Sequence, residues 1–173
     1  MKVNNATGIR NLCEIAAHLL QTMPVNAATK FAVRTLLREA VNKSCPGYRG
    51  NDNKKNVRYV SLAARQALKH GKGPVIADHA VPLSVLLDKV YRRKKIDTDQ
   101  LVRLVSAYSC MVLITRDEDT CLRNAGLVKS MPPDWDTKDV LARYSHAGIR
   151  IRPNLPVNPK RSGSRLSTRA RQL

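Results

Sequence analysis

The sequence predicts an α+β fold that is mostly helical, and three observations lead to this expectation. Apolar residues make up 43% of the 173 residues but aromatic residues only 4%, so the core must consist mainly of Leu, Val, Ala and Ile. Several stretches repeat apolar residues every three or four positions, which is typical of amphipathic helices. Two short apolar runs, at 75–79 and 108–115, favour strands instead. The length favours one compact domain with tails.

Residues 1–73 are expected to form a basic helical region. Apolar residues recur at helical spacing from Gly8 to Met23, where Pro24 stops the helix. Asn26 is a suitable N-cap for a second helix, and the two helices are expected to pack as a hairpin. A stretch rich in Gly, Asn and Lys, residues 43–56, predicts a loop. A third helix is expected over Val57–His70, ended by Gly71.

The central segment, 74–149, is expected to combine strands and helices. The strand at 75–79 is followed by a helical stripe over 81–91 and then by a short helix opened by a capping box of Asp97 and Gln100. The apolar run at 108–115 predicts the second strand.

The second strand leads into two further helical predictions. Thr115 and Glu118 form a second capping box, so the acids 117–119 lie in the first turn of a helix that ends at Gly126. Acids there also stabilise the helix dipole by roughly 0.3–1 kcal/mol each, so they do not require a metal. Asp136 is expected to cap a last helix that ends at Gly148.

Charge divides the chain into the same segments. Residues 1–73 carry 13 Lys or Arg against 3 acids, residues 74–149 carry 11 against 10, and residues 150–173 carry 7 against none, within a net charge of +18. The last segment, rich in Pro, Ser, Gly and Arg, is expected to be a disordered cationic tail. Basic flanks predict a polyanionic partner, nucleic acid above all; attachment to ribosomes or to a membrane surface is the alternative.

Cysteine usage and hydropathy limit the compartment. Cys13, Cys45, Cys110 and Cys121 form no C-x-x-C pair, which argues against a zinc knuckle or a disulfide framework. No apolar run reaches the ~20 residues that span a bilayer, and Glu14 interrupts the N-terminal apolar stretch. These features predict a soluble protein of the cytoplasm.

The pair Asp78-His79, at the end of the first predicted strand, is the strongest chemical signal. An Asp-His dipeptide is common, and what distinguishes this one is the pattern around it. That pattern resembles the HNH-type (His-Me finger, ββα-metal) endonucleases, in a bacterial and phage branch, over residues 74–149. The residues that carry the resemblance are Ala77–Leu83, Ile114–Asp119, Gly126-Leu127, Met131-Pro132, Trp135, Ala142–Tyr144 and Ala147–Ile149.

The resemblance implies a divalent-metal-dependent endonuclease that hydrolyses DNA phosphodiester bonds. By position, His79 becomes the general base that activates water, and Asp78 and Asp119 become ligands of one Mg²⁺ or Mn²⁺ ion. Many relatives carry a histidine where this chain has Asp119, and no residue here matches the middle Asn of the HNH motif. A shift of one position in the alignment would make Glu118 the second ligand.

Clustered cations are candidates for phosphate contacts. Four of them follow the helix over 81–91, two lie in the 43–56 loop and two lie on the predicted helix after Thr115. They are Arg92, Arg93, Lys94, Lys95, Lys54, Lys55, Arg116 and Arg123.

DNA is the expected partner, with RNA not excluded, and no membrane partner is expected. A homodimer or docking to a larger nucleoprotein assembly is compatible with the helical N-terminal region.

The same charge pattern fits a second function. A non-catalytic nucleic-acid-binding or architectural protein with a degenerate HNH-like fold, as part of a phage or nucleoprotein assembly, would carry identical basic flanks. Charge therefore cannot distinguish an enzyme from a binding protein.

Overall fold

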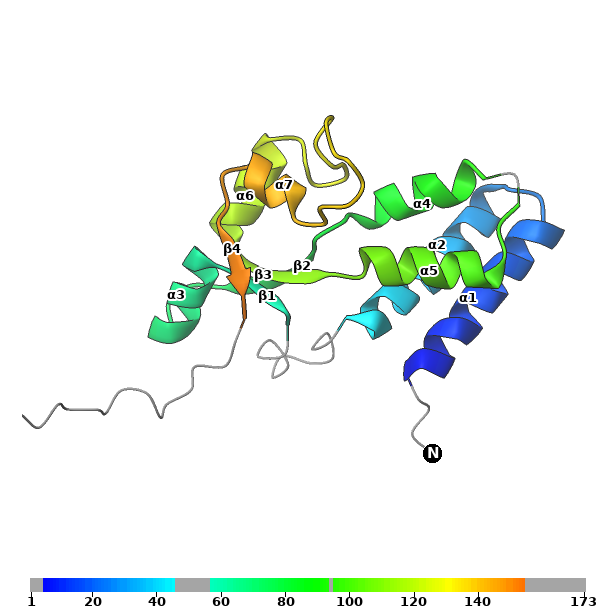
Figure 1. The fold of residues 1–173 in the computed structure, drawn as a ribbon, viewed down its shortest axis with the longest axis horizontal. Coiled ribbons are helices and arrows are strands. Elements are labelled where there is room, and N and C mark those ends of the chain that lie inside the picture. The colour runs from blue at the N-terminus through cyan, green and yellow to red at the C-terminus, as the bar shows by residue number, and fades with distance from the viewer. Residues whose placement is uncertain (1–4, 46–56, 94, 155–173) are drawn as a thin grey trace, which may run out of the picture.

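Helices dominate the fold, and four short strands join into one sheet (Figure 1). The structure is a computed structural model that describes residues 5–45, 57–93 and 95–154. Over these residues the predicted α+β class is confirmed. The elements in chain order are α1 (Asn5–Thr22), α2 (Ala27–Ser44), β1 (Tyr59–Ser61), α3 (Leu62–His70), β2 (Val75–His79), α4 (Leu83–Tyr91), α5 (Thr98–Tyr108), β3 (Met111–Thr115), α6 (Arg116–Asn124), α7 (Ala142–His146) and β4 (Ile151–Pro153).

The sheet is mixed and has the strand order β2-β3-β1-β4. β2 runs antiparallel to β3, with Ala77 opposite Leu113 and His79 opposite Met111. β1 is parallel to β3, while β4 is antiparallel to β1. Because α6 begins at the residue after β3, the antiparallel pair β2-β3 leads directly into a helix, and α4 and α5 form the excursion between the two strands.

Each face of the sheet packs on a different apolar cluster. Val60, Val75 and Leu113 belong to a large cluster shared with α1, α2, α4 and α5. Val112 and Ile114, which flank Leu113 on β3, belong to a second cluster with residues of α6, α7 and the segments beside these helices. The alternation follows from the two-residue period of a strand, so β3 is buried on both faces.

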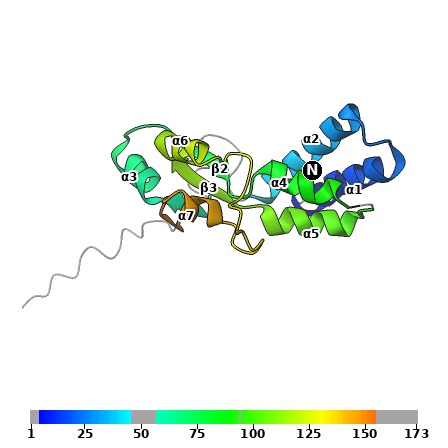
Figure 2. The ribbon, with the colours of Figure 1, turned by 90° about the horizontal axis from the view of Figure 1, so that it is seen from above.

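Helices α1, α2, α4 and α5 lie together beyond one end of the β2-β3 pair (Figure 2). Here α1 and α2 pack as the hairpin that the sequence predicts, with α5 against both. The other end of the molecule carries the sheet, α3, α6 and α7. The end of β2 and the start of α4 therefore lie where the two groups of elements meet.

Three helix caps are confirmed by hydrogen bonds. The Asn26 side chain accepts from the Thr29 amide at 2.9 Å, and Asp97 and Gln100 form a reciprocal capping box. Thr115 and Glu118 form the second box. Each cap satisfies backbone N–H groups that lack a partner in the first helical turn.

Four predictions of local structure are wrong at their boundaries. The strand expected over 108–115 begins only at Met111, because Tyr108 belongs to α5. The helix expected over Val57–His70 begins only at Leu62, because Val60 is fully buried in a strand beside β3 and Ser61 caps α3. Residues 151–153, expected in the disordered tail, form β4 against β1. Asp136 accepts from the amides of Lys138 and Asp139 in a turn, and the helix that follows is limited to α7.

Tertiary pairing explains the differences at β1 and β4, since a short strand gains its hydrogen bonds from a partner far away in sequence. The sheet accordingly draws strands from all three predicted segments, 1–73, 74–149 and 150–173. The remainder of the predicted tail, 155–173, and most of the predicted 43–56 loop lie outside the described residues.

None of the helices among the described residues is both long enough and apolar enough to cross a membrane.

Candidate functional site

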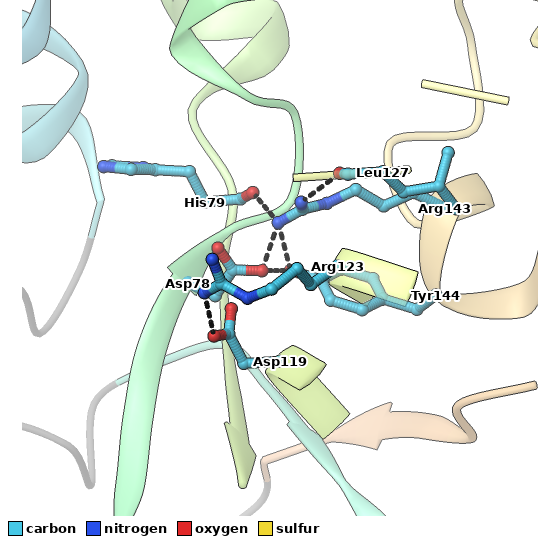
Figure 3. A network of polar contacts seen from close by, with 7 residues as sticks. All are labelled: Asp78, His79, Asp119, Arg123, Leu127, Arg143 and Tyr144. Carbon is cyan, nitrogen blue, oxygen red and sulfur yellow. Dashed lines mark hydrogen bonds and ion pairs between the residues drawn. The ribbon is translucent and has the colours of Figure 1, made fainter. Parts of the chain in front are cut away.

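The Asp78 carboxylate, at the end of β2, is the centre of a polar network (Figure 3). Its Oδ2 atom accepts a hydrogen bond from the Tyr144 hydroxyl at 2.7 Å and forms an ion pair with the Arg143 guanidinium. Arg143 is only 2% exposed and also donates to the carbonyl oxygens of His79, at 2.5 Å, and Leu127, at 2.9 Å. Two adjacent residues of α7 therefore fix the end of β2.

Burial controls the protonation of this network. It raises the pKa of the Asp78 carboxyl, while the positive charge of Arg143 and the hydroxyl of Tyr144 lower it. Burial and the Asp78 charge raise the pKa of Tyr144 well above its usual range, so the phenol stays protonated and remains a donor. The arrangement holds one carboxylate, one cation and one neutral donor.

The His79 side chain extends away from the Asp78 carboxylate (Figure 3). Burial and the nearby Arg143 charge both lower the pKa of its imidazole from the ordinary value of 6.5. Near neutral pH the ring is therefore uncharged and can accept a proton, which is the state that a general base requires.

A cavity of about 310 Å³ opens beside these two residues. Asp78 and His79 contribute to its wall together with three cations, Arg34 of α2, Lys129 and Arg143. The Ser84 hydroxyl of α4, which also lines the cavity, donates to the Lys129 carbonyl oxygen and holds that segment in place. Because Asp78 offsets the charge of Arg143, Arg34 and Lys129 give the cavity a net positive charge beside a neutral imidazole, which suits an anionic ligand such as a phosphate.

The first turn of α6 carries the other predicted carboxylates, and they differ in what they contact. Oε2 of Glu118 accepts from the Thr115 amide at 2.9 Å and from the Ser61 hydroxyl at 2.5 Å. Asp119 pairs with Arg123 across one helical turn at 3.2 Å. Glu118 is thus engaged in capping α6 and linking it to β1, whereas the charged partner of Asp119 among the described residues is the exposed Arg123.

Asp78 and Asp119 lie near each other (Figure 3), and the Asp119 charge contributes to the raised pKa of Asp78. Within 5–45, 57–93 and 95–154, no three His, Cys, Asp or Glu side chains gather into a metal-binding group. Two carboxylates alone still fit the hard, oxygen-based coordination of Mg²⁺, which proteins often bind through one or two carboxylates plus water and phosphate oxygens.

The predicted phosphate-binding cations lie at different places. Arg92 and Arg93 are exposed at the end of α4, and Arg92 lies 3.7 Å from Asp88. Lys95 and Arg116 are exposed, and Arg123 pairs with Asp119. Lys54, Lys55 and Lys94 lie outside the described residues.

No catalytic, metal-binding or phosphate-binding role was predicted for Arg34, Lys129, Arg143 or Tyr144, although Arg143 and Tyr144 lie in the pattern that carries the resemblance. Tyr144 was predicted to point inward, and a buried tyrosine hydroxyl usually has a hydrogen-bond partner, which is the signal that could have linked it to Asp78. Arg34 lies on a helical stripe of cations, which predicts only an exposed face. Nothing local could have predicted that this face borders β2.

No protein-family model, curated protein or solved structure was found to match this chain. The function is therefore inferred from the geometry of the chain's own residues.

Proposed function

We propose that this protein is a divalent-metal-dependent, HNH-like endonuclease that hydrolyses phosphodiester bonds of DNA. The observation that carries the proposal is the His79 imidazole, whose pKa is lowered, beside a cavity lined by Arg34, Lys129 and Arg143. A neutral base and several cations around one space meet two requirements of phosphodiester hydrolysis: proton removal from water and binding of an anionic phosphate.

In this proposal His79 accepts a proton from the attacking water. The water oxygen forms a bond to phosphorus, and the bond from phosphorus to the leaving sugar oxygen breaks. Arg34 and Lys129 bind the non-bridging phosphate oxygens and hold the phosphorus in front of the water. Arg143 stays with Asp78 and helps to keep His79 uncharged by its positive charge.

Asp78 and Asp119 would hold one Mg²⁺ or Mn²⁺ ion. Such an ion, when bound, stabilises the negative charge that grows on the leaving oxygen. Arg123 is 66% exposed and can turn away from Asp119 at little cost, whereas the buried Arg143 remains with Asp78. Glu118 is the weaker candidate, since its carboxylate already accepts the hydrogen bonds that cap α6.

The test is nicking of supercoiled plasmid in Mg²⁺ or Mn²⁺. Wild type and a His18→Ala control, altered at an exposed histidine of α1, should nick the plasmid, whereas His79→Ala and wild type in EDTA should not. Added imidazole should restore part of the activity of His79→Ala, because it replaces the missing base. Nicking by His79→Ala at the wild-type rate would refute the role of His79.

One observation favours the alternative, a non-catalytic nucleic-acid-binding or architectural protein. Arg143 and Tyr144 give Asp78 a structural partner set that explains the residue without any ion. For that function, wild type and His79→Ala should shift the plasmid equally in a gel, and neither should nick it in any divalent ion.

A further inference from the structure

One face of α2 combines the only phenylalanine of the chain with three cations. Lys30, Phe31, Arg34 and Arg38 are all exposed. At 3.6 residues per turn these four positions fall within an arc of about 100° on the helix. The nearby acid Glu39 lies outside that arc, so the face itself carries only positive charge.

Phe31 is 73% exposed, more than any other large apolar residue that the structure identifies as exposed. A large aromatic ring at a helix surface gives up the favourable burial that its side chain would gain in a core. The α2 face therefore keeps an aromatic ring in solvent between cations, which is the side-chain combination that binds bases and phosphates together.

The α2 face is continuous with the candidate site and is held rigidly beside it. Arg34 belongs both to this face and to the wall of the cavity with Asp78 and His79. The Tyr91 hydroxyl of α4 donates to the Lys30 carbonyl oxygen at 3.2 Å, and the Lys30 ammonium lies 5.9 Å from the centre of the Tyr91 ring. These contacts hold the start of α2 against α4, so the backbone that carries Phe31 and the cations lies beside the cavity.

We propose that this face of α2 binds single-stranded nucleic acid and leads it into the cavity. Phe31 stacks on an unpaired base, and Lys30, Arg34 and Arg38 contact the phosphates on either side. The inference rests on the proposed function and makes the substrate class more specific: a strand with unpaired bases rather than an intact duplex.

The charge of the α2 face and the geometry of base stacking indicate which ligand this face binds. A chain of net charge +18 repels a second copy of itself, and the α2 face carries no acid to offset that repulsion. In a duplex both faces of each base are already stacked, so an aromatic side chain gains a base contact only where bases are unpaired. A polyanion with free bases satisfies both the cations and the ring.

Binding is measured by fluorescence anisotropy in EDTA, with a labelled oligothymidylate of about 20 nucleotides, enough to cover more than one binding site of typical length. The comparison ligands are a duplex of equal length and an abasic strand. Phe31→Ala should weaken binding of the oligothymidylate about tenfold and leave duplex binding unchanged. Phe31→Trp should bind like wild type, and Phe31→Leu like Phe31→Ala.

Leu68→Ala is the matched control, because Leu68 is a 47% exposed apolar residue on α3, away from this face. It should bind all three ligands like wild type. The abasic strand should bind wild type and Phe31→Ala equally, since it offers phosphates without bases.

The proposal is overturned if Phe31→Ala binds the oligothymidylate like wild type, or if it loses affinity for the duplex by the same factor. It is also overturned if Phe31→Ala changes only the oligomeric state in size-exclusion chromatography, which would assign the face to contacts between copies. Because binding is measured in EDTA, a selective Phe31 effect without cleavage of either the oligothymidylate or the plasmid in Mg²⁺ would refute the hydrolysis and leave this binding surface standing.

Discussion

The end of β2 and the first turn of α6 both carry carboxylates, yet different kinds of partner hold them. Asp78 contacts Arg143 and Tyr144, which lie more than sixty residues further along the chain. Glu118 bonds mainly within its own helix start, to Thr115, with Ser61 as its distant partner. A carboxylate in a first helical turn thus follows local rules, whereas a carboxylate at a strand end depends on what the tertiary structure brings to it.

The ion pairs in these two regions also differ in solvent exposure. The Asp78–Arg143 pair is nearly enclosed, with 23% and 2% of the respective side chains exposed, while the Asp119–Arg123 pair has 31% and 66% exposed. Removing one partner of a buried pair leaves an uncompensated charge in a poorly solvated place. In an exposed pair, water solvates the charge that remains. The two regions should therefore respond very differently to equivalent substitutions.

The largest effect is expected at Arg143. Arg143→Met should lower the free energy of unfolding by about 3–5 kcal/mol, because it leaves the Asp78 carboxylate without its buried cation. Urea denaturation followed by circular dichroism measures this loss. The double variant Asp78→Asn, Arg143→Met should recover part of it, and an equal loss in both variants would show that Arg143 acts by packing rather than by neutralising Asp78.

A smaller effect is expected at Glu118. Glu118→Ala should cost about 1–2 kcal/mol, because it removes the capping box of α6 and the acceptor for Ser61. Glu118→Gln, which keeps an acceptor oxygen, should lose less in the same urea experiment. If Glu118→Ala instead kept full stability and abolished Mn²⁺ binding in calorimetry, Glu118 and not Asp119 would be the ion ligand.

The pH dependence near His79 should be modest and has a definite sign. Because the pKa of His79 is lowered in the folded state, the unfolded chain binds more protons below pH 6.5, and the free energy of unfolding falls as the pH drops from 6.5 toward that lowered pKa. His79→Asn should flatten this slope in urea denaturation at several pH values. Equal slopes in both proteins would contradict the lowered pKa.

The Asp78 carboxyl acts in the opposite direction at lower pH. Its pKa is raised, so the folded state binds the extra proton, and the contribution of Asp78 to stability declines as the pH rises from 3.8 through that raised pKa. The difference between wild type and His79→Asn isolates the imidazole, because the Asp78 contribution is common to both proteins.

The smallest effect is expected at Arg123. Arg123→Ala should change the free energy of unfolding by about 0.5 kcal/mol or less, as is usual for an exposed pair one helical turn apart. Because it frees the Asp119 carboxylate, Mn²⁺ should bind this variant more tightly than wild type in calorimetry. Asp119→Asn is the control and should bind Mn²⁺ more weakly than wild type.

Local patterns predicted much of the fold but not its sheet. The caps at Asn26, Asp97 and Thr115 were predictable because each involves residues three positions apart, whose geometry is set by the helix itself. The strand β1 was missed because Val60 fits a helical stripe equally well, and only pairing with β3 makes it a strand. The same applies to β4, whose three residues gain their bonds from β1.

Local patterns likewise predicted some residues of the candidate site and missed others. The pattern that ends β2 drew attention to Asp78 and His79, and the acids that start α6 to Glu118 and Asp119. The sequence did not predict that Arg143 would neutralise Asp78 or that Arg34 would reach the same cavity. Those contacts join residues separated by more than forty positions, for which spacing along the chain contains no signal.

By itself, the sequence determined where α2, α5 and α6 begin, and that the chain is strongly basic, since both properties depend on near neighbours or on composition alone. Only the tertiary structure decided which strands pair, which carboxylate loses its solvent and which cations surround His79. The physical reason is that burial and long-range pairing set the cost of each charge, and both arise only when the elements pack together.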